Sequence, residues 1–212
     1  MREPKDLAKH CANVLKVLCQ PGRVKIIDFI RAEEKSVFDI AGAAGFEQSN
    51  ASHHISKMYF LGILDSRKMG QMTLYRLKHQ GSILALIDRA MQRPLLLAPP
   101  ERIGPESRVI KSDDLAMYKL FGDVTRIRII EELRGGEIYG GTLISRLGAA
   151  HYNLSRHMTP LKSAGIVSMR KEKAKTIYRL TDQDYTLSLV DLAKRVILQE
   201  SRDTVQRFEQ MG

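Results

Sequence analysis

The chain has 212 residues, 43% apolar and 27% charged, which is enough for one large domain or for two of about 100 residues. This composition excludes low-complexity, collagenous and disordered chains, and no run approaches the ~18 uncharged apolar residues of a membrane span. Lys and Arg outnumber Asp and Glu by 34 to 24, and the resulting net charge of +10 favours an anionic partner. The N-terminus lacks a secretory pattern and two cysteines make no disulfide framework, so we expect a cytoplasmic protein.

Hydrophobic spacing predicts short helices followed by a hairpin. We expect helices at residues 7–18, 24–30, 39–44 and 48–60, and a further helix from about residue 82. Gly45 provides the stop of the third helix, because glycine adopts the left-handed conformation readily. Residues 63–69 and 72–77 change to β-branched and aromatic content around Gly70 and Gln71, which predicts a β-hairpin.

The chain then repeats this pattern. An offset of 103 aligns residues 14–90 with 117–193 without a gap and gives 23 identities in 77 positions. Residues 92–112 contain four prolines and alternating charges, which is typical of a linker. We therefore expect a first domain at 1–91, a linker at 92–112 and a second domain at 113–212 with a long C-terminal helix.

The net charge lies in the same part of both copies. Residues 48–78 contain five basic residues and one acidic residue, residues 151–179 contain seven and one, and the rest of the chain is neutral overall. Two separate basic patches suggest two copies of one phosphate-binding surface, although a merely solvated face is the alternative.

Helix, short helix, turn, helix and basic hairpin, in this order, form a winged helix-turn-helix, whose second helix enters the major groove of DNA. The expected fold is therefore mainly α with small β-hairpin wings, in two tandem winged helix-turn-helix domains. The motifs Gly122–Ile130, Asn153–Met158, Leu161–Val167 and Thr176–Leu180 resemble the ArsR/SmtB family of winged-helix regulators, with the pattern present twice.

The resemblance implies a sequence-specific DNA-binding repressor that is released by an unidentified effector, either a thiol or redox signal or a small molecule. Such proteins are usually homodimers packed through their first and last helices. A tandem copy implies an intramolecular pseudo-dimer on an imperfect inverted repeat of double-stranded DNA. A homodimer through the terminal helices stays open, and no membrane partner is expected.

The candidate DNA-binding residues lie in the recognition helices and the hairpins. In the first copy they are Gln48, Ser49, Asn50, Ser52, His53, Lys57, Arg67, Lys68 and Arg76. In the second copy they are His151, Tyr152, Asn153, Ser155, Arg156, Lys162, Arg170, Lys171, Lys173 and Lys175. In the recognition helices Arg, Asn and Gln suit base edges and Ser favours phosphates, whereas the Arg and Lys residues of the hairpins suit the adjacent DNA backbone. Helix capping is the alternative role for the two asparagines.

The effector is harder to predict. The family's metalloid site would need cysteines where this chain has Ser36 and Phe38, or Tyr139 and Gly141, so we predict no metal site and no cofactor. Cys11 and Cys19 are candidates for thiol or redox sensing, although small packing residues are the alternative.

Two alternatives stay open at this point. A winged helix can also serve as a protein-interaction or assembly module, and a DNA-binding protein without an effector would act constitutively. An enzyme is not expected, because the sequence has no Gly-rich phosphate loop, no ligand cluster and no nucleophile with an evident base.

Overall fold

The computed structural model describes residues 7–92, 115–148 and 151–210, with side chains left out at 151–153 and 200–210. The predicted linker, 92–112, lies outside the described residues except for its first position. Below, the first half means residues 7–92, and the second half means the described residues from 115 onwards.

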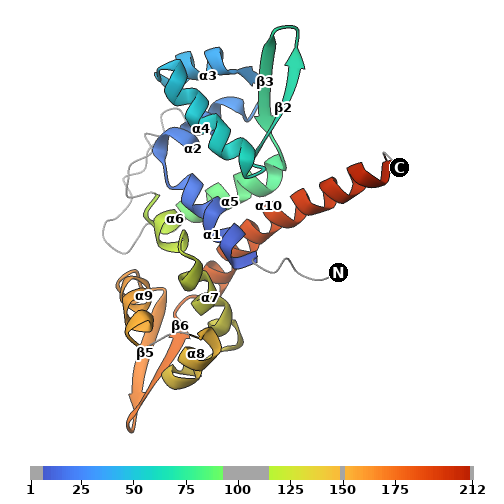
Figure 1. The fold of residues 1–212 in the computed structure, drawn as a ribbon. Helices are drawn as coiled ribbons and strands as arrows, with labels where there is room; N and C mark the ends of the chain where they lie inside the picture. The colour runs from blue at the N-terminus through green and yellow to red at the C-terminus, as the bar shows by residue number, and fades with distance from the viewer. Residues whose placement is uncertain (1–6, 93–114, 149–150, 211–212) are drawn as a thin grey trace.

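The first half is a helical unit with a three-stranded sheet (Figure 1). Its elements are α1 (Leu7–Leu18), α2 (Pro21–Ile30), β1 (Lys35–Ser36), α3 (Val37–Ala44), α4 (Gln48–Phe60), β2 (Leu64–Met69), β3 (Met72–Leu77) and α5 (Gln80–Met91). Strand β3 pairs antiparallel with β1 on one side and β2 on the other. The mainly helical winged helix-turn-helix predicted for this half is confirmed.

The second half has the same order of elements. They are α6 (Ala116–Phe121), α7 (Val124–Glu132), the 3-10 turn η2 (Leu133–Gly135), β4 (Ile138–Tyr139), α8 (Gly140–Leu147), α9 (His151–Ser163), β5 (Val167–Glu172), β6 (Lys175–Leu180) and α10 (Gln183–Gln210). Its sheet has the order β4-β6-β5, which corresponds to β1-β3-β2. Hairpins β2–β3 and β5–β6 lie at opposite ends of the molecule (Figure 1).

Hydrogen bonds also recur at the offset of 103 residues. The Arg23 and Arg126 guanidinium groups donate to the carbonyls of Val17 and Leu120, at 2.9 and 3.0 Å. The Gln80 and Gln183 side chains donate to the carbonyls of Arg31 and Arg134, at 2.7 and 2.9 Å. In both halves, therefore, an arginine of α2 or α7 bonds to the end of the preceding helix, and a glutamine at the start of α5 or α10 bonds to the backbone just after α2 or α7.

Capping explains where α3 begins and ends. The Ser36 hydroxyl accepts a hydrogen bond from the Asp39 amide, and the Asp39 carboxylate accepts one from the Ser36 amide, which forms a capping box. The helix therefore begins at Val37, two residues before the predicted start. Gly45 ends it with a φ of 70°, as predicted.

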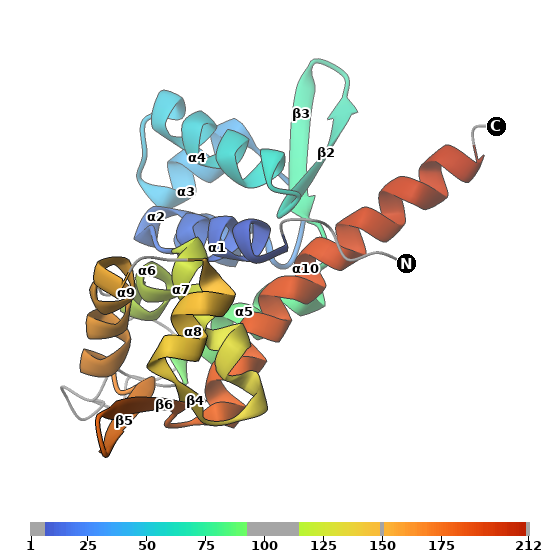
Figure 2. The ribbon, with the colours of Figure 1, turned by 60° about the horizontal axis from the view of Figure 1, so that its bottom comes forward.

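One continuous apolar core joins the two halves. Helix α1 packs against α6, α7 and α10, and α5 packs along α10 (Figure 2). Hydrogen bonds cross between the halves from Tyr118 to the Ile87 carbonyl (3.4 Å), from Tyr185 to the Ala90 carbonyl (3.4 Å), from Arg89 to Ser188 (2.7 Å) and from Ser82 to Gln199 (2.8 Å). The first and last helices of each half, together with α7, therefore form the contact between the halves.

Helix α10 departs furthest from the repeat. It has 28 residues against 12 in α5, and its C-terminal part extends away from the body (Figure 1). Within the residues described, no helix combines the length and apolarity needed to cross a bilayer.

Candidate nucleic-acid interface

Helix α4 has one buried face and one exposed polar face. Ala51, Ile55 and Met58 recur at helical spacing and are buried. The predicted contact residues Gln48, Ser49, Asn50, His53 and Lys57 are exposed, and Ser52 is half-buried. Glu47 occupies the N-cap position of α4 without a side-chain hydrogen bond, so Asn50 does not cap this helix. The exposed face offers amide, imidazole and ammonium groups to a partner.

Helix α9 has the matching arrangement. Leu154, Met158 and Leu161 are buried, whereas Ser155, Arg156 and Lys162 are exposed. The predicted residues His151, Tyr152 and Asn153 form its first turn, and their side chains are outside the described ones. The helix continues through Pro160 to Ser163. Helix α9 thus presents an arginine where α4 presents His53, since these positions match in the repeat.

A histidine anchors each of these helices to the preceding part of its half, with different neighbours. His157 Nδ1 lies 3.3 Å from the Asp123 carboxylate, which also caps α7. His54 instead lies against Phe46, with ring centroids 5.5 Å apart. Burial lowers the pKa of His54, and the nearby charge of Arg23 lowers it further. Burial and Arg23 therefore disfavour the charged form of His54, whereas His157 lies beside an acid.

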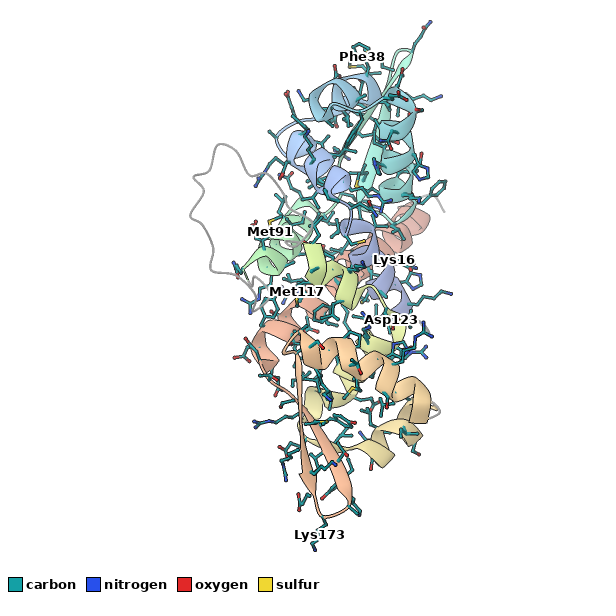
Figure 3. All side chains as sticks on the ribbon, turned by 90° about the vertical axis from the view of Figure 1, so that its left-hand side faces the viewer. Lys16, Phe38, Met91, Met117, Asp123 and Lys173 are labelled. Carbon is teal, nitrogen blue, oxygen red and sulfur yellow. The ribbon has the colours of Figure 1, made fainter. Side chains whose placement is uncertain are left out.

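The arginines predicted to contact phosphates are occupied by carboxylates in both hairpins. Arg67 pairs with Glu34 at 2.5 Å, and the matching Arg170 pairs with Glu137 at 2.8 Å (Figure 3 labels the second hairpin at Lys173). Arg76 pairs with Asp65 at 3.0 Å, and Arg170 also pairs with Glu172 at 2.7 Å. Ion pairs at exposed positions are weak, so a DNA phosphate could replace the carboxylate partner of any of these arginines.

Sequence reasoning missed Glu34 and Glu137 as partners of the wing arginines. Both lie 33 residues before their arginine, in the segment that leads into the short first strand. The signal was available, because Glu34 and Glu137 are one of the identical pairs in the repeat.

The predicted lysines of the hairpins are all exposed. They are Lys68 in the first hairpin and Lys171, Lys173 and Lys175 in the second. Lys175 also lies over the ring of Tyr139, with its nitrogen 5.3 Å from the ring centroid. The second hairpin therefore presents more positive charge to solvent than the first.

The two candidate effector cysteines differ in environment. Helix α1 ends at Leu18, so Cys11 lies inside the helix and Cys19 in the turn that follows it. Cys11 is fully buried, and burial raises its pKa to about 12. Cys19 is half-buried, and both thiols are free. A buried thiol with a raised pKa reacts slowly, which favours the packing role for Cys11.

Acidic, histidine and cysteine side chains do not gather at a metal-like site anywhere in the described part of the chain. Ser36, at one position of the family's metalloid site, belongs to the capping box of α3.

Comparison with known proteins supports the family resemblance. The family described as "Bacterial regulatory protein, arsR family" matches residues 20–66, the segment from α2 into β2. The arsenical resistance operon repressor of Staphylococcus xylosus is 31% identical over 72 residues, covering 34% of this chain and 69% of that protein. The chain belongs to the arsR family of bacterial regulatory proteins.

Two further proteins are similar to parts of this chain. The HTH-type transcriptional regulator CmtR of Mycobacterium tuberculosis (strain ATCC 25618 / H37Rv) is 32% identical over 79 residues, covering 37% of this chain and 67% of that protein. The crystal structure of M. tuberculosis Rv0081 is 30% identical, covering 42% of this chain and 90% of that one with a TM-score of 0.39. The family segment lies in the first half, although the motifs that suggested the resemblance come from the second.

Proposed function

We propose that this arsR-family chain is a sequence-specific double-stranded DNA-binding transcriptional regulator. In this proposal each half is a winged-helix domain, and one chain provides both DNA-binding surfaces for an imperfect inverted repeat. The observation that carries the proposal is the recurrence of the same elements, sheet order and hydrogen bonds at an offset of 103 residues.

The packing between the halves supports an intramolecular pseudo-dimer. The contact uses α1, α5, α6, α7 and α10, which are the first and last helices of each half together with α7. Val196 of α10 is buried in the common core. A single chain can therefore present two recognition helices, which suit half-sites about one helical turn apart, roughly 34–36 Å.

We assign the recognition of DNA bases to the positions that differ between the halves. His53 and Arg156 occupy matching exposed positions, and an arginine favours guanine whereas a histidine does not pair bidentately with it. The two half-sites should therefore differ in sequence, which makes the inverted repeat imperfect.

Repression is the expected direction of regulation, because the related protein of S. xylosus is named a repressor. If a thiol signal releases the DNA, Cys19 is the better candidate, since Cys11 is buried with a raised pKa. A chain that needs no effector is the competing version of the same function.

The test is binding of the purified full chain to the DNA upstream of its own coding sequence, measured by fluorescence anisotropy across a salt series. We expect selective binding that weakens steeply with salt. For each phosphate contacted, the logarithm of the association constant should fall by about 0.9 per tenfold rise in salt concentration. Arg156→Ala should weaken binding by about tenfold or more, because a bidentate base contact contributes roughly 1–3 kcal/mol. In this variant, base changes in the half-site bound by α9 should no longer alter the affinity, whereas changes in the other half-site still should.

Arg195→Gln serves as the matched control, because Arg195 is an exposed cation on α10, outside the proposed interface. If the wild-type chain shows no preference over random DNA at any salt concentration, the regulator is the wrong function and the protein-interaction module becomes the better one.

A further inference from the structure

The tips of the two hairpins differ in chemistry. In the first hairpin, Met69 and Met72 form the last residue pair before the turn, and 47% and 52% of their surfaces are exposed. In the second hairpin, the last pair is Glu172 and Lys175, and the turn begins with Lys173. Two large apolar side chains thus lie in solvent where the matching hairpin has charged ones.

The cations beside the tips differ in number too. In the first hairpin Arg67 and Arg76 pair with carboxylates, which leaves Lys68 as its exposed cation without an ion pair among the described residues. The second hairpin has two such cations, Lys171 and Lys173, which are also exposed and form no ion pair among the described residues. The first tip is therefore apolar beside one cation, and the second is strongly cationic.

Both hairpins leave their recognition helices in the same way. The Ile63 and Ile166 amides donate to the carbonyls of Met58 and Leu161, at 3.0 and 2.9 Å. Because this geometry is shared, a DNA duplex on α4 meets the first tip at the place where a duplex on α9 meets the second. The same position on DNA is then met by methionines in one half and by lysines in the other.

We propose that Met69 and Met72 insert into the minor groove of duplex DNA beside the first half-site, while Lys171, Lys173 and Lys175 hold phosphates beside the second. This inference rests on the proposed function, since it assigns how each half meets DNA. Methionine is among the apolar side chains that wedge between base steps in the minor groove, and its flexible thioether adapts to an irregular surface. Lys68 lies next to Met69 and supplies the cation that faces the adjacent backbone.

The proposal predicts unequal demands on the two flanks. The flank at the first hairpin must unstack a base step, so it should prefer easily kinked pyrimidine–purine steps. The flank at the second hairpin needs only phosphates, so its sequence should be indifferent. Most of the salt dependence from the hairpins should come from the second one.

The experiment compares Met69→Gln/Met72→Gln with Lys173→Gln/Lys175→Gln in the full chain. The DNA is the duplex protected by the wild-type protein, with 2-aminopurine placed in one flank or the other. For the methionine variant we expect affinity to fall by about tenfold, because the groove insertion is lost, with an unchanged salt slope. The 2-aminopurine signal of one flank should no longer respond.

The lysine variant should behave in the opposite way. Its salt slope should fall by about 1.8, at roughly 0.9 per lysine, and the 2-aminopurine response should remain. The methionines are exposed, so thermal unfolding of the variant should match that of the wild type.

The outcomes separate the inference from the function beneath it. Selective DNA binding by the wild type, with an unchanged affinity and 2-aminopurine response in the methionine variant, overturns the inference alone. Absence of selective binding by the wild type overturns both. If the methionine variant changes sedimentation of the free protein and leaves DNA binding intact, the tip contacts a second copy of the chain and the minor-groove role is wrong.

Discussion

Lys16 of α1 lies directly against Gly122, the residue that leads into α7. A β-carbon on Gly122 would lie 3.1 Å from the Lys16 Cβ, 3.2 Å from its Cα and 3.0 Å from the Tyr118 carbonyl oxygen. The backbone of the second half therefore reaches α1 at a distance that only glycine permits without a shift.

Gly122→Ala should destabilise the chain by about 1–3 kcal/mol, because overpacking forces backbone shifts. Gly42→Ala is the matched control, since Gly42 lies in helix α3 and a β-carbon there meets nothing within 4 Å. The control should be more stable by about 0.5–1 kcal/mol. Urea unfolding measures both, and equal stability of Gly122→Ala and the wild type would show that the two halves are not packed at this point.

The low pKa of His54 predicts a loss of stability in weak acid. Burial lowers the pKa of His54 in the folded chain, while the unfolded value is about 6.5. Between these two values the unfolded chain binds more protons, so stability rises with pH there and is lost as the pH falls below about 6.5.

His54→Gln should flatten this part of the stability curve, measured by urea unfolding at a series of pH values from 5 to 8. Ser56→Ala, an exposed change on the same helix without a titrating group, should keep the wild-type slope. A wild-type slope in His54→Gln would mean that another group carries the pH dependence.

The boundaries of most elements could be predicted, because local residues set them. Gly45 and the Gly70-Gln71 turn lie where the sequence placed them, and α4 has its predicted limits. The start of α2 was predicted three residues late, since Pro21 occupies the first turn, where its missing N–H is tolerated.

What could not be predicted depends on distant partners. Strand β1 is two residues long and exists only through its pairing with Leu74 and Tyr75. Arg67 and Arg170 were predicted as DNA contacts, and each pairs with a glutamate 33 residues earlier that the prediction did not include. Periodicity reports the face that a residue occupies, and it carries no information about which residue across the sheet meets it.

Glu131 is predicted to stabilise the second half above weakly acidic pH. Burial raises the pKa of Glu131, but hydrogen bonds from Arg134 and Lys194 lower it more, so the net shift is downwards. Stability from this group is therefore present above the unfolded pKa of about 4.3 and lost as the pH falls through the folded one.

Glu131→Gln should cost about 1–2 kcal/mol at pH 7, because the hydrogen bonds from two charged groups, Arg134 and Lys194, weaken. Asp28→Asn changes the matching position of the first half, where the carboxylate lies 3.7 Å from Arg31 and is more exposed. That change should cost less than about 0.5 kcal/mol. Thermal unfolding of both variants gives the comparison, and equal losses would contradict the role given to the Arg134 pairs.

The two cysteines should react at very different rates. With a pKa of about 12, only about one Cys11 thiol in 10⁴ is ionised at pH 8, and the side chain is buried as well. Iodoacetamide should therefore label Cys19 at least about tenfold faster than Cys11 in the native chain. Mass spectrometry of quenched samples resolves the two sites, and denaturation in urea should remove most of the difference. Equal native rates would show that α1 opens readily.

Under the proposed function, the joining of both halves in one core gives the operator a direction. A homodimer sits equally well on a palindrome in either orientation, whereas a chain with a histidine in one reading helix and an arginine in the other fits its site in one orientation only. Under the same proposal, the covalent connection would keep the second half beside the DNA after the first has bound. Such a regulator would distinguish upstream from downstream by itself, and the long end of α10 would always lie on the same side of the gene.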